Sequence, residues 1–124
     1  MIASPYPPLQ ERYPDFPEFA PRREKIRWAC DKRLALDRNR CRVSGWIHVD
    51  PAHLLVRNHP SPLYCAYDPD WITSLSRWFH SSPLNPDCFD SHKSVEARHE
   101  WLKRHRLHRE AEMLELILRG VAAP

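Results

Sequence analysis

Histidines at three places in the chain have the residue types and neighbours that acid–base or metal chemistry needs. His53 stands in the segment PAHLL, three residues after Asp50, and His80 ends the segment WITSLSRWFH. His92 follows Cys88 by four residues, a spacing that puts two ligands on one face of a helix. Near pH 7 a neutral imidazole can accept a proton or bind a metal ion. The sequence therefore predicts general-base chemistry, metal binding or both.

Each of these histidines also fits a structural role. His53 lies between a proline–alanine pair and two leucines, a setting in which the ring could hydrogen-bond to backbone. His80 could simply end an apolar turn, and His92 could lie on a helix surface. The residue types alone leave both interpretations open.

The composition and charge pattern indicate a folded domain with two basic flanks. Hydrophobic residues make up 42% and charged residues 28% of the 124 residues, and the net charge is +3. Residues 22–42 hold nine Arg or Lys and three acids, and residues 93–109 hold six and two. The section 43–90 between them has two Arg and five Asp. This pattern suits either a phosphate backbone approaching a metal centre or a pair of solvated helices.

The sequence contains no apolar run of about 18 residues and no apolar run near its beginning, so we expect a cytoplasmic protein without a membrane segment. Its four cysteines form no CxxC pair. We therefore expect free, buried thiols rather than disulfides or a four-cysteine zinc site.

The prolines and the apolar periodicity predict the elements that must position these residues. Six of the 13 prolines fall within residues 1–21, which predicts an extended arm that packs its aromatic rings onto the body or onto a second subunit. Residues 22–124 are expected to form one domain. Within it we predict an amphipathic helix from Pro21 to about Asp37 and two short strands or strand-like segments between Arg38 and Arg57.

The second half of the domain is expected to be mainly helical. A strand–helix join or short helix is predicted for residues 71–80, and one long helix from about Asp90 to Arg119. The apolar end of that helix needs a cover, either a dimer partner or the N-terminal arm. We expect four of the large rings to lie in the core: Trp46, Trp71, Trp78 and Trp101.

Three motifs in order resemble the HNH endonuclease family, in its branch without zinc-binding cysteine pairs. They are CRVSG at Cys41–Gly45, AHLL at Ala52–Leu55 and the segment WITSLSRWFH at Trp71–His80. The resemblance covers roughly residues 23–90. It implies an α+β fold with a ββα-metal core, flanked here by an N-terminal helix and a long C-terminal helix.

The same resemblance implies a metal-dependent endonuclease that hydrolyses DNA phosphodiester bonds. It assigns His53 as the general base and His80 as a metal ligand, with Asp50 or His92 completing the metal shell. Magnesium or manganese is the expected cation, and zinc or nickel also suits histidine. Small proteins of this kind occur in phages and mobile elements. Four arginines are the candidate DNA contacts: Arg57, Arg104, Arg106 and Arg109.

Several alternatives stay open at this point. The segment CFDSHK resembles a second register of the motif, which would make His92 rather than His80 its last histidine. Ala52 stands where the family often has a metal ligand. The chain could therefore be a catalytically inactive nucleic-acid-binding protein on the same fold, or a small interaction or inhibitor protein. A homodimer through the N-terminal arm or the C-terminal helix is also compatible with the sequence.

Overall fold

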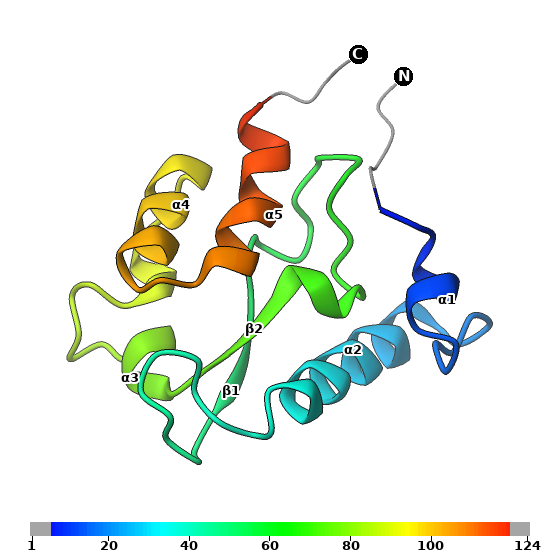
Figure 1. The fold of residues 1–124 in the computed structure, drawn as a ribbon, viewed down its shortest axis with the longest axis horizontal. Helices are drawn as coiled ribbons and strands as arrows, with labels where there is room; N and C mark the ends of the chain where they lie inside the picture. The colour runs from blue at the N-terminus through cyan, green and yellow to red at the C-terminus, as the bar shows by residue number, and fades with distance from the viewer. Residues whose placement is uncertain (1–5, 120–124) are drawn as a thin grey trace.

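A two-stranded antiparallel hairpin lies at the centre of the molecule, with helix α2 on one side and helices α3, α4 and α5 on the other (Figure 1). The structure is a computed structural model and describes residues 6–119. The strands are β1 (Asp50–His53) and β2 (Ile72–Leu75), and the helices are α1 (Leu9–Arg12), α2 (Arg22–Leu36), α3 (Arg77–His80), α4 (Val95–Arg104) and α5 (His108–Leu118). Two 3₁₀ turns, η1 (Pro69–Trp71) and η2 (Phe89–Ser91), complete this α+β domain.

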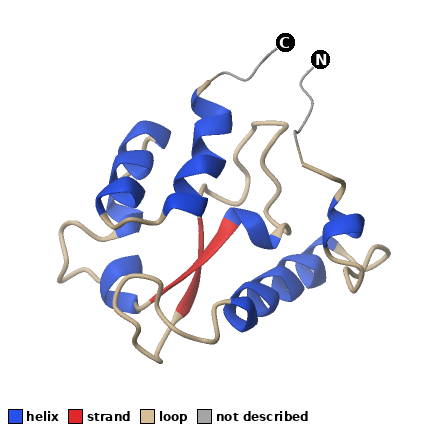
Figure 2. Cartoon of the chain, viewed as in Figure 1, coloured by secondary structure: helices blue, strands red, loops and turns tan. Residues whose placement is uncertain are grey.

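The hairpin joins two segments that are 18 residues apart in the sequence. Asp50 pairs with Leu75 and His53 with Ile72. Of the two strands or strand-like segments predicted between Arg38 and Arg57, only β1 is a strand in the structure. The preceding CRVSG segment instead closes a turn, in which Gly45 adopts a φ of +78° and donates its N–H to the Cys41 carbonyl at 2.8 Å. Figure 2 shows the long loops that surround the short strands.

Helix α2 confirms the predicted amphipathic helix. It starts directly after Pro21, whose fixed φ suits a helix start, and it buries Ile26, Ala29 and Cys30 against the body. At its C-terminal end, Arg38 adopts a left-handed φ of +58°. The Asn39 N–H then reaches back to the Leu34 carbonyl at 2.7 Å, which satisfies one of the last carbonyls of the helix.

The prediction of one long C-terminal helix is wrong, since the chain bends between α4 and α5. Arg106 adopts a φ of +60° and donates to the Lys103 carbonyl at 3.0 Å. The Leu107 N–H donates to the Leu102 carbonyl at 2.9 Å, and both leucines are buried. This pair of bonds is a Schellman motif. Helices α4 and α5 consequently fold back and pack together (Figure 1).

The N-terminal arm packs two of its aromatic rings onto the body, Tyr13 and Phe16, whereas Phe19 is 95% exposed, so the predicted packing of the arm is met only in part. Tyr13 and Phe16 contact Trp28 of α2 edge-on, with ring centroids 6.0 and 5.4 Å apart. Tyr13 also donates its hydroxyl to Asp70 at 2.6 Å. The arm is not wholly extended, because α1 forms one helical turn in it. Residues 1–5 of the arm lie outside the described residues. The predicted homodimer through this arm or the C-terminal helix stays a prediction.

The core lies between the hairpin and the helices. Trp71 and Trp101 are 2% and 0% exposed, which confirms the prediction for these two rings. Trp46 and Trp78 are 63% and 50% exposed, so the prediction that they are core residues is wrong. All four cysteines are free thiols, and Cys30, Cys41 and Cys88 are buried. Among the described helices, none has both the length and the apolar sequence that crossing a membrane would require.

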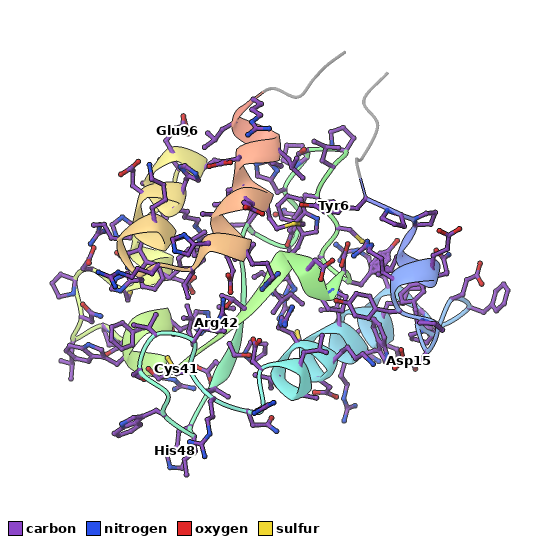
Figure 3. The ribbon with its side chains drawn as sticks, viewed as in Figure 1. Tyr6, Asp15, Cys41, Arg42, His48 and Glu96 are labelled. Atoms are coloured by element: carbon purple, nitrogen blue, oxygen red, sulfur yellow. The ribbon has the colours of Figure 1, made fainter. Side chains whose placement is uncertain are left out.

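A buried carboxylate ties the hairpin to helix α5. Glu110 is 0% exposed and accepts a 2.7 Å hydrogen bond from the Thr73 hydroxyl of β2. Arg42 donates to it at 3.1 and 3.2 Å, and Arg109 lies 3.2 Å away. Figure 3 labels Arg42 between the hairpin and α5. The network fixes β2, and through β2 it fixes the strand that carries His53.

Candidate active site

His53 ends β1 and has the properties of a neutral base. Its Nε2–H donates to the Ala66 carbonyl at 2.9 Å, because a carbonyl can only accept. In the neutral ring the lone pair is then on Nδ1. Burial lowers the pKa of His53, with a smaller contribution in the same direction from the positive charge of Arg57. The ring is therefore neutral near pH 7, as a general base requires.

His80 ends α3 and lies between two carboxylates. Its Nδ1 is 3.4 Å from Asp50 of β1, and its Nε2 is 3.2 Å from Asp90 of η2. Burial lowers the pKa of His80, but the two carboxylates outweigh burial and raise it above its usual value. His80 thus joins three elements: the start of β1, helix α3 and the turn η2.

His53, His80 and Asp90 line one cavity of about 310 Å³. Asp50 does not line it but lies on the far ring nitrogen of His80, where it orients the imidazole. The two aspartates therefore differ in their position relative to the cavity. Asp90 lines the same cavity as His53, whereas Asp50 contacts His80 Nδ1 outside that cavity.

Three cations line the same cavity: Arg57, Lys93 and Arg98. Arg98 is 6% exposed, and its guanidinium donates to the carbonyls of Leu54 and His92 at 2.9 and 2.8 Å. It also lies 3.7 Å from Asp90. Arg98 therefore connects the end of β1 to the turn that carries Asp90, and it adds positive charge to the wall of the cavity.

The donor atoms of this cavity fit a divalent cation only as a two-ligand site. Within residues 6–119, no three His, Cys, Asp or Glu side chains are arranged to hold a metal ion. His80 Nε2 and the Asp90 carboxylate are 3.2 Å apart. Neighbouring ligands of an octahedral ion with bonds of 2.0–2.1 Å lie about 3 Å apart, so these two atoms suit one ion. Such an ion would need substrate oxygens and water to complete its shell.

The structure does not bring the other predicted site residues to this cavity. His92 pairs with Asp87 at 2.8 Å, and Arg104 pairs with the same carboxylate at 2.9 Å. Arg109 donates to the carbonyls of Asp70 and Ile72 at 2.9 Å, where it supports the fold. Arg106 lies in the turn between α4 and α5. Of the four arginines that were predicted to contact DNA, only Arg57 lines the cavity.

Sequence reasoning missed Asp90, Lys93 and Arg98. Asp90 and Lys93 lie in the CFDSHK segment, which was considered only for Cys88 and His92, and Arg98 follows that segment by five residues. Asp90 stands in that segment as a carboxylate, but nothing in the sequence shows that η2 packs against His80.

A second hollow lies beside the site. It measures about 820 Å³ and is lined by the exposed rings Trp46 and Trp78, together with Ile47 and Arg77. Asp50 belongs to its wall and also contacts His80, so this groove adjoins the cavity. His48, from the same loop as Trp46, lies at the edge of the molecule (Figure 3).

Comparison of the chain with models of protein families, with curated proteins and with solved structures found no match.

Proposed function

We propose that the chain is a metal-dependent endonuclease that hydrolyses DNA phosphodiester bonds, with β1, β2 and α3 forming the ββα-metal arrangement that the HNH resemblance implies. The observation that supports this proposal is the cavity shared by His53 from β1 and the His80–Asp90 pair. It combines a neutral base, a two-atom cation site and three cationic side chains within one small space.

His53 is the proposed general base. Its Nε2–H is held by the Ala66 carbonyl, which leaves the Nδ1 lone pair to take a proton from the attacking water. The water oxygen then bonds to phosphorus, the bond from phosphorus to the leaving oxygen breaks, and solvent protonates that oxygen. Arg57 and Lys93 would bind the phosphate oxygens before and during this step.

His80 and Asp90 would hold the cation, with Asp50 orienting His80 through the other ring nitrogen. A bound divalent ion would neutralise charge on the phosphate and on the leaving oxygen. Magnesium and manganese suit the carboxylate, and zinc or nickel suits the imidazole. This assignment replaces Asp50 by Asp90 as the second proposed ligand.

Incubation of supercoiled plasmid DNA with the purified chain and magnesium, manganese, nickel or zinc tests the proposal. Wild type should nick the plasmid in at least one metal and stop in EDTA. His53→Ala should lose at least about 100-fold in rate, because a positioned base contributes that much. His92→Ala is the matched control, since this histidine also pairs with an aspartate but lies outside the cavity. It should keep the wild-type rate.

A non-catalytic nucleic-acid-binding protein is the second candidate function. The observation that favours it is the placement of His80, whose two ring nitrogens are both already next to carboxylates. In that arrangement a proton on His80 could serve in place of a cation and leave a stable but inert site. DNA binding without nicking in any of the four metals would refute the endonuclease and support this candidate.

A further inference from the structure

A basic groove lies along the first half of α2, on the side where β1 ends. It measures about 630 Å³ and has Ile26 and Cys30 in its wall. Four arginines complete its lining: Arg22, Arg23, Arg27 and Arg57. All four are exposed. Arg23 and Arg27 are four residues apart on the helix, so their side chains emerge on one face about 6 Å apart.

These four arginines differ from most of the others because no carboxylate neutralises them. Within the described residues, none of the four forms an ion pair with Asp or Glu. The exposed arginines Arg104 and Arg119 on α4 and after α5 do form such pairs, with Asp87 and Glu115. Four of the seven described arginines without such a pair therefore line this one groove, where their positive charge favours a polyanion.

The groove continues into the candidate active site through Arg57. Arg57 lines both the groove and the cavity that contains His53. Arg22 donates to the Arg57 carbonyl at 3.0 Å, which holds the start of α2 against the loop after β1. A chain of phosphates lying in the groove would thus lead directly to the cavity.

We infer that this groove, formed by Arg22, Arg23, Arg27 and Arg57, binds the sugar–phosphate backbone of the nucleic acid and guides it to the His53–His80 cavity. The inference rests on the proposed function, and it moves the nucleic-acid face from the C-terminal helices to α2. Phosphate contacts of this kind set affinity and register without reading sequence. They also make binding strongly dependent on salt, because each contact releases a condensed counterion.

Fluorescence anisotropy with a labelled 20-base-pair duplex and a labelled 20-nucleotide single strand, both in EDTA, tests this inference without cleavage. The variants are Arg23→Gln with Arg27→Gln, and a control that carries Arg104→Gln with Arg119→Gln. Both doubles lower the net charge by two, both replace exposed arginines, and glutamine preserves helix propensity. Circular dichroism verifies that each variant is folded.

The groove double should reduce the slope of log K against log salt by about 1.8 on the duplex or about 1.4 on the single strand. With equal affinities at 1 M salt as the reference, these changes in slope correspond at 0.1 M salt to roughly 60-fold weaker binding of the duplex or roughly 25-fold weaker binding of the single strand. The control double should change binding by less than about 3-fold. Whichever of the two probes shows the loss identifies the form of nucleic acid that the groove accepts.

Three results would overturn the inference. The first is that the two double variants weaken binding equally, which would mean that net charge alone drives binding. The second is that neither double variant changes binding. The third is that polyglutamate of matched charge competes for the groove as well as DNA does. The plasmid assay separates the two proposals. A groove double that binds and nicks as wild type refutes the groove and leaves the endonuclease intact, whereas groove-dependent binding without nicking in any metal refutes only the endonuclease.

Discussion

Replacing Glu110 by glutamine should destabilise the protein in a way that depends on pH. Glu110 is fully buried and receives hydrogen bonds from Arg42 and from the Thr73 hydroxyl. Burial raises the pKa of Glu110, but the Arg42 hydrogen bond, the charge of Arg109 and the Thr73 hydroxyl outweigh it and lower the pKa to about 2. Glutamine has the same shape but no charge, so Glu110→Gln removes the carboxylate from between two arginines.

The size of the effect follows from the pKa. A difference between about 4.5 in the unfolded chain and about 2 in the folded protein corresponds to about 3 kcal/mol of stability near pH 7. Because the folded-state pKa is the lower one, this contribution is complete above about pH 5 and is lost as the pH falls towards 2. At pH 3 only about 1 kcal/mol should remain.

Urea unfolding of wild type and Glu110→Gln at pH 7, 5 and 3, followed by tryptophan fluorescence, measures this difference. Glu112→Gln is the control, because Glu112 is an exposed residue on the same helix. It should change the free energy of unfolding by less than about 0.5 kcal/mol at every pH. If the wild-type advantage over Glu110→Gln stays constant from pH 7 to pH 3, the charged carboxylate is not what stabilises the network, and the argument fails.

Three further predictions concern the fold. Trp101→Ala should cost about 3–5 kcal/mol in urea unfolding, whereas Trp78→Ala, at a half-exposed ring, should cost less than about 1 kcal/mol; equal losses would contradict their placement. Arg106→Gly should not lower the melting temperature, because glycine suits its φ of +60°. Glu100→Gly, at an exposed position inside α4, should instead cost about 1 kcal/mol. His105→Phe should raise stability by about 1 kcal/mol, since the buried His105 Nε2 has no hydrogen-bond partner in residues 6–119; a loss of stability would indicate a partner that the ring needs.

The elements that follow from local chain chemistry could be predicted, and α2 is the clearest case. Pro21 favours a helix start, and Ile26, Ala29 and Cys30 recur at helical spacing, so both the helix and its buried face followed from the sequence. The break between α4 and α5 could not be predicted in the same way. Its C′ residue is Arg106, where glycine or asparagine is usual, and buried packing of Leu102 and Leu107 compensates for that choice.

Strand pairing was harder to predict, because it depends on partners far apart in the sequence. Local β propensity suggested two short strands or strand-like segments between Arg38 and Arg57. In the structure Asp50–His53 pairs with Ile72–Leu75, which the Glu110 network and α2 hold in place. The exposure of Trp46 has a related cause, since its segment forms a turn around Gly45 and no second strand covers it.

The same distinction applies to the candidate site. His53 and His80 could be identified because each belongs to a segment with a recognisable local pattern, and the structure does place both on one cavity. Asp90 is brought there by Arg98, which links η2 to β1 through backbone carbonyls and through the Phe89 ring 4.7 Å away. No local pattern encodes that contact. The position of Asp90 therefore depends on the packing of α4. Substitutions at Arg98, which also donates to the His53 carbonyl at 3.4 Å, should disturb the site although the side chains of His53 and His80 are unchanged.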